Sequence, residues 1–338
     1  MRVSLKSTNS SIPLIILLIV VTVILCLSFL ASLTFGVADI HWQDLPKAFT
    51  AFDGSTSHLI ITTIRLPRAI IALLVGAGLG MAGSLMQGIT RNPLADPSIL
   101  GINSGAVLAV VVTTFVLNEP SLNILAIFAF LGATISSIAV YFFASLSKNG
   151  LSPLSLTLAG SAITVFCSSL TSGILILNQR TLDEIRFWLA GSIAGRDIEL
   201  IKQILPYFVI GLILALILAR QITILSLGEE TAKGLGQNTL LIKIGAMIAV
   251  ILLAGASVSL AGPIGFIGLI MPHLVRLLVG NDYRWILPFS MLGGAILLLN
   301  ADIVSRLILK PQEVPVGLIL PILGAPFFIY LIQGKIKK

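Results

Sequence analysis

The chain has 338 residues, of which 57% are hydrophobic and 10% are charged, against roughly 25% charged residues in an ordinary soluble domain. Its formal net charge is +7. The few charges cluster and leave long charge-free stretches. This pattern excludes a disordered chain, a disulfide scaffold, a coiled coil and a soluble globular enzyme, and it leaves a polytopic α-helical membrane protein.

The charge-free intervals are each long enough for a membrane span, which needs about 20 apolar residues. The interval 244–275 exceeds one helix and contains Gly262-Pro263, so we expect two helices there. The expected helices cover about 12–34, 66–89, 98–118, 122–146, 154–177, 201–224, 241–261, 264–280, 285–302 and 315–333. These ten helices leave no room for a soluble domain, so we predict an all-α protein with one membrane domain over 1–338.

Ten spans place both ends of the chain on the same side of the membrane. With an inside N-terminus, 12 of the Lys and Arg residues lie inside and 9 lie outside, in agreement with the positive-inside rule. We therefore expect cytoplasmic N- and C-termini, with residues 1–11 as a cytoplasmic tail. No basic stripe with interleaved aromatic residues occurs, so we expect no nucleic-acid partner.

Cysteine and histidine residues predict neither a redox site nor a metal site. Cys26 and Cys167 lie within apolar spans and are interpreted as small buried hydrophobic residues. His41, His58 and His273 are scattered along the chain and match no metal-ligand spacing. We expect no metal and no cofactor.

Two arginines open the second predicted span from the outside, in the stretch Arg65-Leu66-Pro67-Arg68. Proline suits a first helical turn, but cations are unfavourable at a helix N-terminus. The arginines either extend to the membrane interface or clasp carboxylates of an external protein. Arg306, at the outer C-terminal end of the ninth span, is explained more simply by the helix dipole.

The second span also contains a glycine-rich stretch. Residues 78–83 fit the dinucleotide-binding pattern G-x-G-x-x-G, but they lie within an apolar helix and follow no strand. Gly76 and Gly80 form a GxxxG pair, which favours close helix packing. Residues 73–83 match 252–262, and Pro93/Pro272 and Gly101/Gly280 match at the same offset. This weak repeat predicts a possible inverted repeat.

The fifth span carries polar residues at helical spacing, namely Ser161, Thr164, Ser168 and Thr171/Ser172. This spacing places them on one face, where they either line a wet path or bond to a neighbouring helix. The outer segment 178–200 follows, and within it residues 186–200 predict a short amphipathic surface helix.

A polar cytoplasmic segment, 226–238, follows the sixth span. Ser226 and Glu229 have the spacing of a capping box and predict a helix start, while Gly234 and Gly236 predict its end. The helix suits docking to a soluble partner, although an ordinary solvated connection fits as well. No P-loop motif occurs, and no span has an acidic residue at its centre. Energy for transport must therefore come from a partner.

Motifs in a fixed order cover residues 12–333. They are Arg65-Leu66-Pro67-Arg68, Asn92-Pro93-Leu94-Ala95-Asp96-Pro97 with Gly101, Trp188 to Gly191, Leu227-Gly228-Glu229-Glu230, Gly262-Pro263-Ile264-Gly265-Phe266-Ile267-Gly268-Leu269, Pro272-His273, Arg276, Ala301-Asp302 with Arg306, Glu313-Val314-Pro315-Val316-Gly317 and Gly324-Ala325-Pro326-Phe327. Together they resemble the permease subunits of bacterial ABC importers for iron–siderophores, haem and cobalamin.

The resemblance implies a dimer of permeases, each with ten spans, that binds two cytoplasmic ATPases and an extracytoplasmic substrate-binding protein. Arg65, Arg68 and Arg306 match outward arginines that pair with glutamates of the binding protein. Within the cytoplasmic segment 225–240, the residues that match the ATPase-coupling helices are Ser226, Gly228, Glu229, Glu230, Ala232, Gly234, Leu235 and Gly236. The fifth span matches a pathway-lining helix, through Ser161, Thr164, Ser168 and Ser172.

The implied function is a permease that moves an iron(III)–siderophore complex across the bacterial cytoplasmic membrane by alternating access. It has no enzymatic activity, because ATP hydrolysis belongs to separate subunits. A cobalamin or haem permease of the same family remains an alternative, and the dimer is either homomeric or heteromeric. An ion-coupled secondary carrier is disfavoured by the absence of acidic residues at span centres. A non-transporting scaffold is disfavoured by the helix breaks and the polar stripe.

Overall fold

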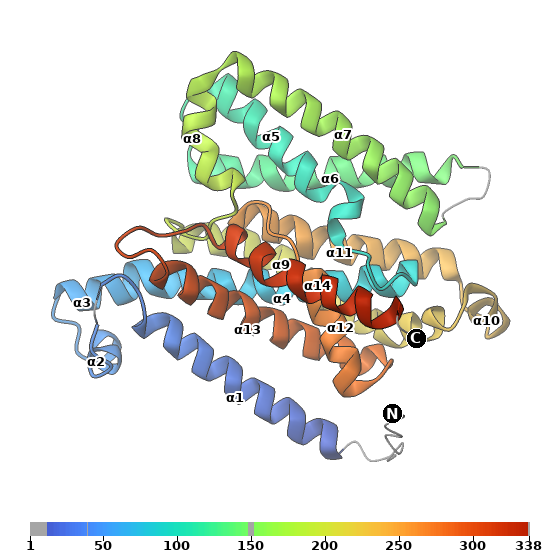
Figure 1. The fold of residues 1–338 in the computed structure, drawn as a ribbon, viewed down its shortest axis with the longest axis horizontal. Coiled ribbons are helices and arrows are strands. Elements are labelled where there is room, and N and C mark those ends of the chain that lie inside the picture. The colour runs from blue at the N-terminus through green and yellow to red at the C-terminus, as the bar shows by residue number, and fades with distance from the viewer. Residues whose placement is uncertain (1–11, 39, 148–151, 337–338) are drawn as a thin grey trace.

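The computed structural model describes residues 12–38, 40–147 and 152–336, and within these residues the chain is helical with no strand (Figure 1). The predicted cytoplasmic tail 1–11 lies outside the described residues. Seven described helices are long and apolar enough to cross a membrane. The chain is therefore a multi-pass membrane protein, in agreement with the predicted all-α class.

The long apolar helices match predicted spans. They are α1 (Ile12–Thr34), α4 (Leu66–Thr90), α6 (Leu122–Ser145), α7 (Pro153–Leu177), α9 (Ile198–Ser226), α11 (Thr239–Ala261) and α13 (Tyr283–Leu307). A short helix α3 (Thr56–Leu59) and a π-helical turn η1 (Ile60–Arg65) lead directly into α4.

Shorter elements complete the fold. The remaining predicted spans correspond to α5 (Ile102–Leu117), α12 (Ile267–Val279) and α14 (Val316–Ile336). The connections contain α2 (Asp44–Thr50), a 3-10 turn η2 (Pro97–Leu100), α8 (Gln179–Leu189) and α10 (Glu229–Gly234).

Polar side chains at the starts of the helices explain why the spans begin where they do. The first backbone N–H groups of a helix have no partner within the helix. Side-chain oxygens accept from them at Ser121, Ser152, Asp197, Asn238 and Asp282. These caps let a helix end at the membrane surface without unpaired donors.

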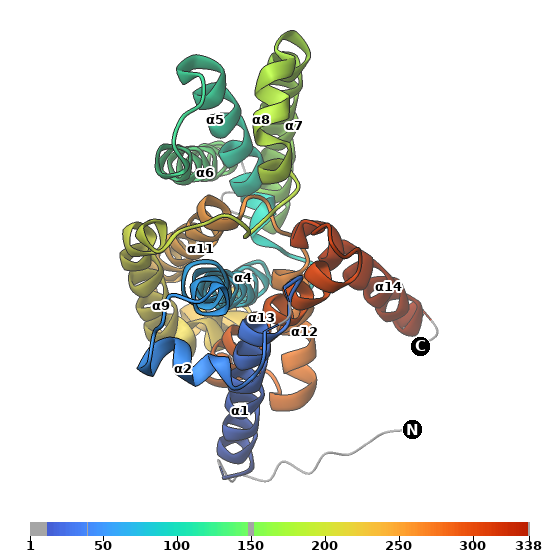
Figure 2. The ribbon, with the colours of Figure 1, turned by 90° about the vertical axis from the view of Figure 1, so that its left-hand side faces the viewer.

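Helix α4 lies at the centre of the molecule and packs against α13 through its glycines (Figure 2). A Cβ atom at Gly76 would lie 2.3 Å from the Gly294 carbonyl oxygen, and one at Gly80 would lie 2.2 Å from that of Ser290. Only glycine permits this approach of two backbones. The packing interpretation of the GxxxG pair is confirmed, and the dinucleotide-binding pattern lies inside a continuous helix.

The predicted break near Gly262-Pro263 separates α11 from α12. Gly262 and Phe266 have φ angles of 72° and 71°, outside the helical region. Gln87 of α4 donates to the Gly268 carbonyl at 3.3 Å, and Arg276 donates to the Gln87 side-chain oxygen at 2.6 Å. The irregular backbone is therefore buried against protein groups, as a break at membrane depth requires.

The surface helix predicted within 186–200 lies further toward the N-terminus. Helix α8 runs from Gln179 to Leu189 and is capped by Asn178, whose side chain accepts from the Thr181 N–H. The chain leaves the helix after Leu189 because Gly191 and Gly195 adopt φ angles of 75° and 69°. Residues 190–197 therefore form a loop that leads into α9.

Helices α5 to α8 form a layer beside the body built around α4 (Figures 1 and 2). In the most apolar windows of these spans, 83% of α4 residues are buried, against 17% of α7 residues. The two segments of the possible inverted repeat lie in α4 and α11, which pack against each other. The repeat itself stays a prediction.

Candidate functional site

At one end of the bundle, three arginines and two acidic residues form what we call the outer arginine cluster: Arg65, Arg68, Asp302, Arg306 and Glu313. Arg68 contacts Asp302 at 2.8 Å and Glu313 at 2.5 Å. Arg306 contacts the second carboxylate oxygen of Asp302 at 2.8 Å. Asp302 is fully buried, so two guanidinium groups share one carboxylate that water does not reach.

Two of these arginines bind the end of α1. Arg65 donates to the Leu33 carbonyl at 3.0 Å and also to those of Thr34 and Ala38. Arg306 donates to the Ser32 carbonyl at 3.0 Å. The last carbonyls of a helix lack partners and carry the negative end of its dipole. The cation at the start of the second span is thus stabilised by the C-terminus of a different helix.

The cluster does not present its arginines outward. Arg65, Arg68 and Arg306 are 4%, 6% and 2% exposed, and each already has partners within the chain. The most accessible ionised side chain of the cluster is Glu313, at 36%. Their predicted pairing with a binding protein stays a prediction, but in this arrangement Glu313 occupies Arg68.

Asp302 lies near the end of α13, and its side chain is enclosed and neutralised by Arg68 and Arg306. The i,i+4 spacing of Asp302 and Arg306 is a local signal for that pair. Arg68 is 234 residues away in the sequence, and no local pattern reveals it.

At the opposite end, the segment 226–238 forms the short helix α10 as expected, but it starts differently. Ser226 donates its hydroxyl to the Thr223 carbonyl at 2.6 Å instead of capping. The N-cap is Gly228, with φ 137° and no side-chain hydrogen bond. The predicted capping box is therefore wrong, because Glu229 is engaged elsewhere. The predicted end is correct, since α10 ends at Gly234 and Gly236 has φ 79°.

Glu229 anchors α10 to the membrane body. Its carboxylate contacts Lys243 of α11 at 2.7 Å and Lys233 at 3.2 Å. The hydrogen bond with Lys243 is the main cause that lowers the pKa of Glu229. Ala232 is buried beneath the helix, while Glu230, Gly234, Leu235 and Gly236 are exposed. Leu227 and Leu235 project at 69% and 65% exposure, one at each end of α10.

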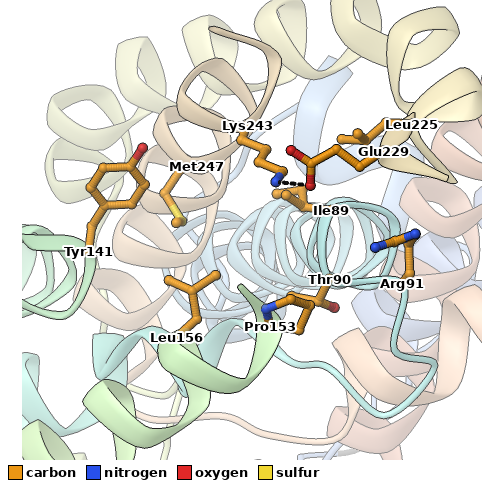
Figure 3. A pocket seen from close by; sticks show the side chains of 10 residues that line it. All are labelled: Ile89, Thr90, Arg91, Tyr141, Pro153, Leu156, Leu225, Glu229, Lys243 and Met247. Carbon is orange, nitrogen blue, oxygen red and sulfur yellow. Dashed lines mark hydrogen bonds and ion pairs between the residues drawn. The ribbon is translucent and has the colours of Figure 1, made fainter. Parts of the chain in front are cut away.

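Hollows lie around the base of α10, and Figure 3 shows the side chains that line the smallest of them. Arg91 lines three of them, with volumes of about 20, 560 and 320 Å³. Arg91 is the left-handed C-cap of α4, and the Glu229–Lys243 pair lies across the smallest hollow. The base of α10 is thus hollowed on several sides.

The polar stripe of the fifth span lies on α7. Ser161, Ser168 and Ser172 are exposed, and the Thr164 hydroxyl accepts one long hydrogen bond of 3.4 Å from the Ser104 hydroxyl. Thr171 is buried with an unpaired hydroxyl. Exposed hydroxyl groups on a spanning helix call for water or another protein, because lipid supplies no hydrogen-bond partner.

The sequence has known relatives. Residues 17–334 match the model of the FecCD transport family. The probable siderophore transport system permease protein YfiZ of Bacillus subtilis (strain 168) is 45% identical over 332 residues, which cover 98% of either chain. The Fe(3+)-citrate import system permease protein YfmD of Bacillus subtilis (strain 168) is 46% identical over 89% of either chain.

A solved structure has the same fold. It is described as an inward-facing conformation of a putative metal-chelate type ABC transporter. Its TM-score is 0.82 at 31% identity, and the match covers 94% of this chain and 99% of that one.

Proposed function

The chain belongs to the FecCD transport family, and from that premise we propose that it is the membrane permease of an ABC importer for an iron(III)–siderophore complex. It is a transport subunit without enzymatic activity, as the family is. The observation that carries the proposal is the near-complete match to permeases named for siderophore and iron(III)-citrate transport. The bacterial cytoplasmic membrane is the location that these relatives support.

The proposal includes ten spans. The seven long apolar helices are joined by three shorter ones, α5, α12 and α14. The 16 residues of α5 reach about 24 Å at 1.5 Å per residue, less than the roughly 30 Å hydrocarbon core. The turn η2 precedes α5 within the protein and supplies the missing length. With both termini in the cytoplasm, residues 1–338 form one permease domain.

A second permease subunit is the partner proposed for α7. Its stripe of hydroxyl groups and its exposed apolar side chains lie at the edge of the molecule, uncovered by this chain. Ser161, Thr164, Ser168 and Ser172 would line the path between the two subunits. Few strong polar groups line it, which suits a bulky chelate that is passed on rather than held.

The two ends of the molecule serve different soluble partners in this proposal. The segment 225–240 of each permease docks one of the two cytoplasmic ATPases through α10, and the exposed Leu227 and Leu235 suit a protein contact. The outer arginine cluster supports the face that receives the substrate-binding protein. Arg65, Arg68 and Arg306 hold the residues of that face in place. Of the three, only Arg68 is proposed to pair with a glutamate of the binding protein, which would replace Glu313 as its partner.

Reconstitution tests the function. The chain, purified with the subunits that accompany it, is placed in proteoliposomes with ATP inside and an iron–siderophore complex bound to its binding protein outside. We expect uptake of radiolabelled iron that depends on ATP and on the binding protein. Uptake driven by a proton or sodium gradient without ATP would contradict the proposal.

A further inference from the structure

Arg196, in the loop between α8 and α9, is buried and has no counter-ion beyond its chain neighbour Asp197. It is 9% exposed, and its Nε atom has no hydrogen-bond partner. The other buried arginines of the described chain are Arg65, Arg68 and Arg306, and each has several bonds. Among the buried arginines that the structure describes, Arg196 is thus the unsatisfied one.

The charge of Arg196 is costly and is nevertheless retained. Burial lowers the pKa of its guanidinium to about 10, which leaves the group protonated at neutral pH. Asp197 is the nearest source of negative charge, but its carboxylate accepts from the Leu200 N–H at 3.2 Å to cap α9. A buried cation without a paired anion is strongly unfavourable, so an anion from outside this chain would relieve it.

The loop that carries Arg196 lies next to the proposed path helix. Its first turn is fastened to the start of α14, since the Gly317 N–H donates to the Gly191 carbonyl at 2.9 Å. Figure 2 shows the loop crossing between the α5–α8 layer and α4 at the end that faces the viewer. It therefore lies where α7, the proposed path helix, reaches the outer surface through α8.

We propose that Arg196 contacts the oxyanion groups of a negatively charged iron(III) chelate as it enters the path, and so sets the charge class of the substrate. This rests on the proposed function. A group that is nine-tenths buried lies below the level at which another protein docks, so the anion that reaches it is a small one. Chelates built on carboxylates or catecholates have such oxyanions and a net negative charge.

The test compares two probes in the reconstituted importer: iron(III) citrate, which is anionic, and an uncharged iron(III) trihydroxamate. We expect Arg196→Gln to raise the KM for the citrate complex about tenfold and leave that for the trihydroxamate within twofold. Arg196→Lys should recover much of the loss.

Arg186→Gln is the matched control, because Arg186 is an exposed arginine of α8 that lies over the Phe187 ring. It should leave both probes unchanged. Equal loss of both probes in Arg196→Gln, or loss of subunit assembly on size-exclusion chromatography, would overturn the inference. So would a wild-type importer that accepts only the uncharged chelate. Failure of the proposed function looks different, because the wild type would then move neither probe with ATP.

Discussion

The outer arginine cluster and helix α10, at opposite ends of the molecule, use the same kinds of ion pair in opposite settings. In the cluster, Arg68 and Arg306 enclose a fully buried Asp302. At α10, Glu229 holds Lys243 and Lys233 while its own side chain is 33% exposed. Buried pairs are costly to break, whereas exposed pairs contribute little. The outer charges therefore hold the fold, and the inner charges are free to exchange partners.

Removal of the shared carboxylate should give the largest effect. Asp302→Asn leaves Arg68 and Arg306 buried with one anion fewer, and breaking such a pair costs about 3 to 5 kcal/mol. We expect a large fall in the thermal unfolding temperature of the detergent-purified protein. Asp183→Asn is the control, because Asp183 is exposed. If both variants unfold at the wild-type temperature, the outer cluster does not hold the fold.

Loss of a tie to α1 should come next. Arg65→Gln removes charge-assisted bonds to the end of α1, but the glutamine amide is also a hydrogen-bond donor, so we expect a smaller loss of stability than for Asp302→Asn and a loosening of α1 from α13. The Asn300 side chain donates to the Ser28 hydroxyl at 3.0 Å, so cysteines at these two positions report the contact. In a background lacking Cys26 and Cys167, cross-linking should fall with Arg65→Gln.

The exposed Lys47 on α2 gives the control for this cross-link. Lys47→Gln should leave the yield unchanged. Equal yields in all three proteins would show that Arg65 does not position α1. This result also bears on docking, because a charge reversal of Arg65 or Arg68 would first disrupt the fold. A docking test is cleaner at the half-exposed Glu313, where Glu313→Gln frees Arg68 with little loss of packing.

At α10, a single substitution should impair ATP coupling strongly and change stability only slightly. Glu229→Gln weakens a partly exposed pair, so we expect a stability loss of less than about 1 kcal/mol but loss of substrate-stimulated ATP hydrolysis. Glu199→Gln, which breaks the exposed pair of Glu199 with Lys202 at the far end of α9, is the control. Normal stimulation in Glu229→Gln would rule out a coupling role for this anchor.

The pH dependence of the same variant follows from the sign of the shift. Lys243 lowers the pKa of Glu229 below its ordinary 4.5. The stabilisation is therefore complete above the pKa of the unfolded state and disappears as the pH falls below 4.5 through the lower folded value. Wild type and Glu229→Gln should differ in unfolding temperature at pH 6 and converge at low pH.

The helices could be predicted from the sequence because membrane spans are charge-free and their ends are not. The prediction for 12–34 matches α1, and that for 122–146 ends one residue beyond α6. The close packing at the GxxxG pair could also be predicted from the sequence, since it depends only on residue size. These features are local, or they need no knowledge of the neighbouring element.

The site was less predictable because its charges pair across the chain. Arg68 meets Asp302 from 234 residues away, and Arg65 binds the end of a helix that precedes it. Ser226 and Glu229 have the spacing of a capping box, but Lys243 on the next helix competes for the carboxylate. Residue types and spacing identified the charged residues, while tertiary pairing decided which of them face outward.

Among these variants, the smallest change in stability is expected for Lys233→Gln. Lys233 is 62% exposed and pairs with Glu229 four residues before it, a spacing that contributes about 0.3 to 0.5 kcal/mol. Lys233→Gln should therefore change stability by no more than that and leave ATP coupling intact, because Lys243 still holds Glu229. A double-mutant cycle with Glu229→Gln measures the pair. A coupling energy above about 1 kcal/mol that persists at high salt would mean that α10 is held as firmly as the outer cluster.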